Sequence, residues 1–97
     1  MPAYVIAQID IHDPEEYQIY LQGFMPIFER YDGKLLVTSA KEPILLEGNW
    51  DLQRVVVMEF PDTNRAQKWL NDPDYTKLAR HRHRSANTNL ILVEGIN

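Results

Sequence analysis

The clearest pattern along the chain is an apolar run from Gln53 to Phe60 that is rich in β-branched residues. Such a run predicts a strand at the centre of a sheet. Arg54 and Glu59 are charged residues inside this run, and they lie an odd number of positions apart. Because successive residues of a strand face opposite sides, we expect the two charges to point to different faces of the sheet, or to lie at its end.

Another strand is predicted from Tyr4 to Ile11, where apolar residues alternate with a mixed set of side chains. One side is wholly apolar, whereas the other combines Tyr4, Ile6, Gln8 and Asp10. The mixed side need not face solvent, and it could line a cleft. Further strands are expected at residues 34–39, 44–47 and 90–94, with a polar turn at 85–89 before the last of them.

The first helix is predicted to begin at Asp13-Pro14, because Asp13 can cap the free N–H groups and Pro14 fits the first turn. Glu16 stands at the capping-box position. Pro26 lies inside the helical spacing that follows, so we expect a kink or a break close to Gly23. Gly33 is expected to end the helix in a left-handed conformation.

Two more helices are predicted after the central strand. Asp62 can cap the first of them, and Asp72-Pro73 ends that helix and caps the next. Tyr75 and Arg82 are seven positions apart, so they share one face of the last helix, together with Leu78.

The order of these elements predicts the fold class. If the short strand at residues 44–47 is set aside, the order is βαββαβ, which is the ferredoxin-like pattern. The chain of 97 residues is long enough for one domain, residues 1–97, and leaves little room for a second. We therefore expect a single α+β domain with an antiparallel sheet and helices on one face.

Composition narrows the classes of function. The formal net charge of −4 argues against a general nucleic-acid binder, which needs a positive face. The absence of cysteine excludes disulfides and thiolate chemistry. No apolar run approaches membrane length, and the N-terminus does not read as a signal peptide, so the expectation is a cytoplasmic protein with no membrane partner.

Several short motifs follow one another along the chain. They are Asp13-Pro14-x-x-Tyr17, Tyr31-x-Gly33, Leu46-Glu47-Gly48-x-Trp50, Arg54-Val55-Val56-Val57, Glu59-Phe60-Pro61, Asp72-Pro73-x-Tyr75 with Arg82 following, and Leu92-Val93-Glu94-Gly95. In this order they resemble the family catalogued as domain of unknown function 1330, and the resemblance covers nearly the whole chain. It implies a dimeric α/β barrel, in which the sheets of a homodimer pack face to face. Asp32 departs from the family pattern, which usually has glycine there.

Glu59 and His12 are the candidate catalytic residues. Glu59 shares a strand face with valines, and a carboxylate in apolar surroundings suits general acid or base work. The plainer interpretation places Glu59 at the strand end or in an ion pair with an arginine of the last helix. His12 follows the first strand and could carry protons beside a cleft, or it is simply a loop residue.

Trp50, Arg54, Tyr75 and Arg82 are the candidate ligand-binding residues. An aromatic ring beside a guanidinium can hold a carboxylate or a planar ligand, which fits Trp50 with Arg54. Tyr75 and Arg82 could join Arg54 in holding an anion. The alternatives are an aromatic plug at a dimer edge for Trp50, and structural salt bridges for the arginines.

The histidines make a poor metal site. His81 and His83 are two apart on a predicted helix and point away from each other, unlike the four-apart pairs that bind zinc. The basic tract from Arg80 to Arg84 fits a solvated helix end, where cations suit the helix dipole. We therefore predict no metal.

Three functions stay open on the sequence. One is a cofactor-free enzyme, of isomerase or monooxygenase type, acting on a small apolar or aromatic molecule; this rests on analogy with similar barrels. Another is a dimeric module that binds or senses a small molecule without chemistry. The last is a homodimer that binds no ligand. An enzyme requires a closed pocket with a titratable group of displaced pKa, whereas a structural dimer requires no cavity.

Overall fold

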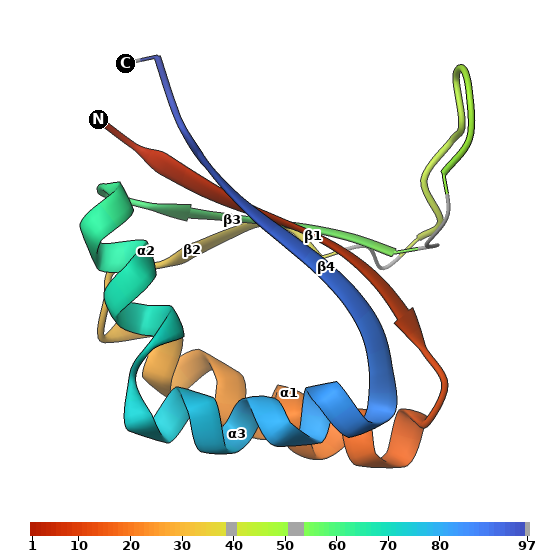
Figure 1. The fold of residues 1–97 in the computed structure, drawn as a ribbon, viewed down its shortest axis with the longest axis horizontal. Helices are drawn as coiled ribbons and strands as arrows, with labels where there is room; N and C mark the ends of the chain where they lie inside the picture. The colour runs from red at the N-terminus through yellow and green to blue at the C-terminus, as the bar shows by residue number, and fades with distance from the viewer. Residues whose placement is uncertain (39–40, 51–53, 97) are drawn as a thin grey trace.

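The computed structural model describes residues 1–38, 41–50 and 54–96. Its four strands form one antiparallel sheet in the order β2-β3-β1-β4, and the three helices cover one face of it (Figure 1). The predicted α+β, ferredoxin-like arrangement is therefore confirmed. The elements are β1 (Ala3–Ile11), α1 (Pro14–Glu29), β2 (Lys34–Val37), β3 (Arg54–Phe60), α2 (Thr63–Leu70), α3 (Pro73–Ser85) and β4 (Ala86–Glu94).

The strand predicted at the centre of the sheet is an interior strand, since β3 lies between β2 and β1. In the register of β1 with β3, Arg54 lies opposite Ile9, which is buried against the helices. Glu59 lies opposite Tyr4. The two charges therefore face opposite sides of the sheet, as expected from their odd spacing. We call the side that the helices cover the helix face, and the other side the open face.

A kink or a break was expected near Gly23, and the break is wrong, because helix α1 continues through Pro26. Aromatic and aliphatic side chains are buried on both sides of the proline, among them Tyr20, Phe24 and Phe28. Their packing on the sheet stabilises a continuous helix against the loss of one backbone donor. The predicted cap is confirmed, because the Asp13 side chain accepts a hydrogen bond from the Glu16 N–H at 3.3 Å.

The left-handed residue after α1 is Asp32, with φ of 58°, rather than Gly33 as expected. The short polar side chain of Asp32 tolerates this conformation better than most. Gly33 is needed for another reason. A Cβ there would lie 2.4 Å from the ring of Phe28, which is fully buried.

Two predicted elements differ in the structure. Residues 44–47 form no strand in the described part of the chain, and Ile44 and Leu46 are almost fully exposed because this segment rises beyond the sheet, away from the helices (Figure 1). The turn at 85–89 is also absent, since α3 ends at Ser85 and β4 begins at Ala86. Residue 39 of the second predicted strand and Gln53 of the central one lie outside the described residues.

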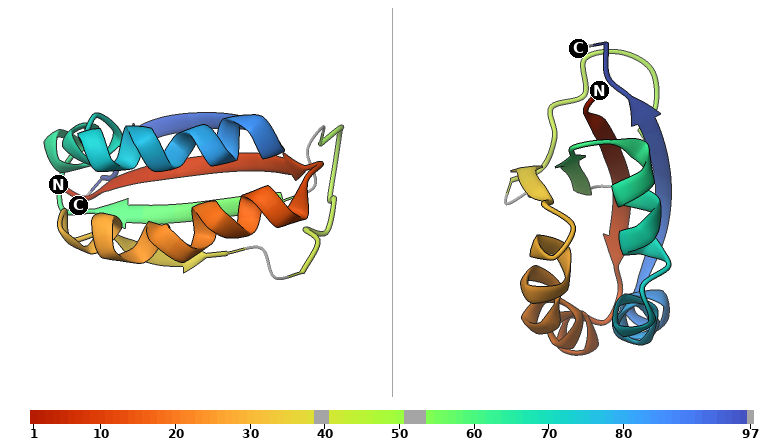
Figure 2. Two further views of the ribbon diagram at one scale, coloured as in Figure 1. Left: turned by 90° about the horizontal axis from the view of Figure 1, so that it is seen from below. Right: turned by 90° about the vertical axis from the view of Figure 1, so that its left-hand side faces the viewer.

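The core is a cluster of rings between the sheet and the helices. Figure 2 shows α1 and α3 side by side across the helix face. At the centre, the Trp69 ring lies 4.3 Å from that of Tyr75 and 5.3 Å from that of Phe60, measured between centroids. Among the described residues, no helix is long and apolar enough to cross a membrane.

Candidate functional site

A cavity of about 220 Å³ lies on the helix face, between the sheet and helices α1 and α3. Most of its wall is aromatic or aliphatic. Arg54 and Arg82 are the charged side chains on it, and no carboxylate or imidazole occurs among the described residues that line it. The lining residues are Ala7, Ile9, Tyr17, Tyr20, Leu21, Phe24, Leu35, Thr38, Arg54, Val56, Met58, Trp69, Tyr75, Arg82, Thr88 and Leu90.

Arg82 is buried, with 6% of its surface exposed, although it is a cation. No ion pair joins it to an aspartate or glutamate in the described part of the chain. Its guanidinium carbon lies 5.7 Å from the centroid of the Tyr20 ring, within the range of a cation–π contact. Burial lowers the pKa of Arg82, but neighbouring Tyr75 and Tyr20 outweigh this and raise it, so the side chain keeps its charge.

The hydroxyl groups of two tyrosines on facing helices form a hydrogen bond next to Arg82. The hydroxyls of Tyr20 on α1 and Tyr75 on α3 are 2.7 Å apart. Burial, together with the proximity of Tyr75, raises the pKa of Tyr20 well above its usual range. Tyr20 therefore stays a neutral hydroxyl and is a weak acid in this environment.

Tyr17 lies close to both arginines. Burial raises the pKa of its hydroxyl, whereas the positive charges of Arg82 and Arg54 act in the opposite direction. Arg54 is exposed, and with Tyr17 and Leu21 it also lines a neighbouring hollow at the start of α1. Arg54 therefore stands at the outer end of the cavity, and Arg82 stands at a buried position.

Sheet register places Arg54 in one row with a third polar residue of the cavity, two strands away. Ile9 of β1 pairs with Arg54 of β3 on one side and with Thr88 of β4 on the other. The three residues form one row across the helix face, with about 5 Å between neighbouring strands. Thr88 Oγ1 and Trp69 Nε1 are buried, and neither has a hydrogen-bond partner among the described residues. Both residues line the cavity.

The structure brings together three of the predicted site residues, Arg54, Tyr75 and Arg82, in this cavity. Trp50 does not join them. It is half exposed and borders a different hollow, with Val55 of the open face and residues 42–47. Trp50 and Arg54, predicted to hold a ligand together, therefore line different hollows of the protomer.

The two predicted catalytic residues lie away from the cavity. Glu59 is on the open face, near the end of β3, where it pairs in register with Lys34 and Tyr4. The His12 side chain is exposed, and its backbone N–H donates a hydrogen bond to the Ser85 carbonyl at 2.9 Å. Neither residue lines the cavity.

Sequence reasoning missed Tyr17, Tyr20, Trp69 and Thr88 as cavity residues. The aromatic positions of α1 have the spacing of any buried helix stripe, which carries no sign of a cavity. Thr88 fell in the predicted turn. Its usable signal is the alternation of polar and apolar residues from Ala86 to Leu92, which continues the strand toward α3.

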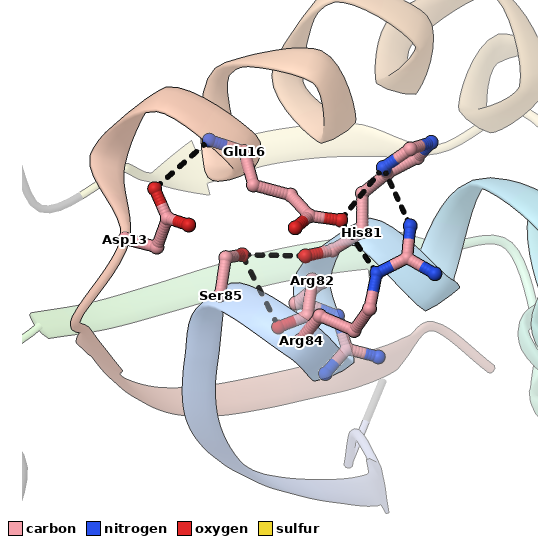
Figure 3. A network of polar contacts seen from close by, with 6 residues as sticks. All are labelled: Asp13, Glu16, His81, Arg82, Arg84 and Ser85. Carbon is pink, nitrogen blue, oxygen red and sulfur yellow. Dashed lines mark hydrogen bonds and ion pairs between the residues drawn. The ribbon is translucent and has the colours of Figure 1, made fainter.

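His81 is held in a polar cluster between two helices (Figure 3). Glu16 Oε2 lies 3.0 Å from His81 Nδ1 and 2.7 Å from Arg84 Nε, and thus joins the start of α1 to the end of α3. The hydrogen bond from Arg84, and then that from His81, lowers the pKa of Glu16. No group of three potential metal ligands occurs among the described residues.

Comparison with known families matches residues 2–96 to the description "Domain of unknown function (DUF1330)". The chain belongs to this family. DUF1330 membership confirms the resemblance in the motifs. A comparison with curated proteins found no match.

Solved structures share the fold of this DUF1330 protein. A protein of unknown function from Rhodopseudomonas palustris is 21% identical, with a TM-score of 0.80 over 99% of this chain and 83% of that one. SnoaB, a cofactor-independent oxygenase from Streptomyces nogalater, is 14% identical, with a TM-score of 0.68 over 99% and 94%. A dimeric ferredoxin-like protein of unknown function from Thermobifida fusca is 10% identical, with a TM-score of 0.64 over 98% and 92%. At these identities the likeness concerns the fold alone.

Proposed function

We propose that this DUF1330 protein is a homodimer that binds a small, largely apolar or aromatic molecule in the cavity of each protomer. The observation that carries the proposal is the cavity itself, about 220 Å³ and lined mainly by rings and aliphatic side chains. An apolar cavity of about 150 Å³ is enough to bind benzene. The space therefore suits one aromatic ring with a short substituent.

Exposed apolar residues on the open face of the sheet support the proposal of a homodimer. Val37, Ile91 and Val93 leave between 39% and 57% of their surface exposed there. The segment before β3 exposes Ile44 and Leu46, which line a hollow together with Val55 of the open face. Large patches of exposed apolar surface are rare on monomers. A second copy that packs its sheet on this face would bury it, and a structural neighbour is described as dimeric.

Catalysis is the second candidate, favoured by the description of one structural neighbour as a cofactor-independent oxygenase. The described cavity wall has no carboxylate or imidazole to move a proton, which disfavours an isomerase working there. A monooxygenase reaction, in which dioxygen is the oxidant and the substrate supplies the electrons, needs no cofactor, and it needs no protein base if the substrate has already lost its proton to water. Glu59 and His12 stay proposals as proton carriers. If the Glu59→Gln variant turns over substrate as fast as the wild type, Glu59 takes no part in the mechanism.

Substitutions at two neighbouring valines test the cavity and the dimer separately. Val56 lines the cavity, and Val57 lies next to it on the open face. Native mass spectrometry of the purified protein should show a dimer, with added mass if a ligand is retained. Val56→Phe should fill the cavity, abolish ligand binding and keep the dimer, whereas Val57→Phe should weaken the dimer.

A monomeric wild type would refute the dimer. Ligand binding that survives Val56→Phe unchanged, in a variant with normal circular dichroism, would refute the cavity as the binding site. The two variants carry the same substitution on the same strand, so each is the control for the other.

A further inference from the structure

The buried guanidinium of Arg82 lacks a negative partner. It is 6% exposed, lies in the last turn of α3, and makes no ion pair with a carboxylate among the described residues. Tyr20 offers its ring, the hydroxyl groups of Tyr75 and Tyr20 are hydrogen-bond partners of the guanidinium, and the helix terminus offers a partial negative charge. None of these is a counterion, and a buried charge without one is strongly disfavoured.

Hydrogen-bond donors with unused capacity surround the same space. Arg54 adds a second cation at the outer end, and Thr88 lies in register with it on the helix face. The Thr88 hydroxyl has no partner in the described part of the chain. Rotation about one side-chain bond can direct it at a ligand. A ligand group that accepts hydrogen bonds and carries negative charge would satisfy Arg82, Arg54 and Thr88 together.

The rest of the cavity wall makes a small inorganic anion a poor ligand. Phe24, Met58 and Trp69 supply apolar or aromatic surface, and hydrated ions gain nothing from it. The ligand therefore needs an apolar body joined to its charge. In a space near 220 Å³, that body is about the size of one ring.

From these observations we infer that the cavity binds a small aromatic carboxylate, with its charged end between Arg82 and Arg54 and its ring among the apolar side chains. This inference rests on the proposed function and adds the chemical class of the ligand. It gives Arg82 its missing partner and leaves the Tyr20–Tyr75 hydroxyl pair intact.

The test compares acids with their uncharged amides. Isothermal titration calorimetry is run on ligand-stripped protein with benzoate, phenylacetate and cinnamate, each against its primary amide. We expect each acid that fits to bind at least about 10-fold more tightly than its amide, because hydrogen bonds to a charged acceptor are stronger than those to a neutral one. Arg82→Gln should lose about 10- to 100-fold in affinity for the acid and keep that for the amide.

Arg54→Gln keeps the test valid if Arg82→Gln fails to fold, because Arg54 is exposed. It should lose about 3-fold in affinity for the acid, as suits an exposed charge. Arg80→Gln, on the exposed side of the same helix as Arg82, is the control and should bind the acid as the wild type does.

Equal affinity for acid and amide would overturn the inference but leave a cavity that binds neutral rings. Binding of neither, in protein that is folded and free of retained ligand, would overturn both the inference and the proposed function. Loss of affinity in Arg80→Gln equal to that in Arg82→Gln would overturn the role of the buried arginine.

Discussion

Replacing Arg82 by methionine should stabilise the ligand-free protein while removing its preference for acids. Methionine keeps an unbranched apolar side chain in the same space and removes the buried charge. The substitution removes the hydrogen bonds of Arg82 with the hydroxyls of Tyr75 and Tyr20, but the two hydroxyls still bond each other at 2.7 Å. In the ligand-free state, the wild-type arginine has only partial compensation for its burial.

The expected change in the free energy of unfolding is the difference between opposing contributions. Burial of an ion disfavours folding by several kcal/mol after relaxation. Against this, Arg82→Met loses the contact with the Tyr20 ring, about 1 kcal/mol, the hydrogen bonds with the Tyr75 and Tyr20 hydroxyls, about 1 kcal/mol net, and about 0.5 kcal/mol from the helix C-terminus. We expect Arg82→Met to gain about 1–2 kcal/mol in the free energy of unfolding. For a domain of this size, 1 kcal/mol corresponds to a rise in Tm of about 4–8 °C.

Urea unfolding, followed by tryptophan fluorescence, measures this change in the free energy of unfolding. Trp69 is 1% exposed in the folded protein, so its emission should change when the protein unfolds. Protomer concentration is held fixed because dimerisation would shift apparent stability. Arg80→Met is the matched control and should lie within about 0.5 kcal/mol of the wild type. If Arg82→Met loses more than about 1 kcal/mol while Arg80→Met is neutral, Arg82 is a well-compensated structural cation. The buried-charge argument for an anionic ligand would then fail.

Two further changes test the fold. Gly33→Ala should destabilise by about 1–3 kcal/mol in urea unfolding, because its Cβ would meet the fully buried Phe28 ring. Gly23→Ala, which meets only the tip of the flexible Leu78 side chain inside a helix, should be neutral or stabilising, and a loss equal to that of Gly33→Ala would contradict the packing argument. Glu16→Gln should lower stability at neutral pH: the folded-state pKa of Glu16 lies below its usual 4.5, so the contribution is present above that value and lost as the pH falls through the folded pKa. Urea titrations over a pH series should therefore show the gap between wild type and Glu16→Gln closing in acid, and a constant gap would refute the role of its charge.

Local patterns were enough to predict most elements of this fold. Capping aspartates, with proline in the first turn at Asp13 and Asp72, indicate helix starts from chemistry that acts within four residues. Errors arose where distant contacts decide the outcome. Pro26 is tolerated because the rings of α1 pack on the sheet, and residues 44–47 stay outside it because no strand in the described residues pairs with them.

The candidate site was predicted only in part, for a similar reason. Tyr75 and Arg82 share a helix face, which their spacing of seven requires, and both reach the cavity. Glu59 was predicted as a catalytic candidate because it lies among valines, and those valines belong to the open face, on the side of the sheet away from the cavity. Its catalytic role stays a prediction, but its place outside the cavity did not follow from the sequence. A sequence pattern shows that a strand has two faces, and it does not say which one the helices cover.

The sequence by itself therefore determined the order of helices and strands, the caps that begin the helices, and the separation of Arg54 from Glu59. These depend on backbone geometry with short periods. Only the tertiary structure decided that Arg54 of β3, Arg82 of α3 and Thr88 of β4 border one cavity without a carboxylate among the described residues. That outcome depends on the register of three strands and the packing of α3 across them, which involve residues far apart along the chain.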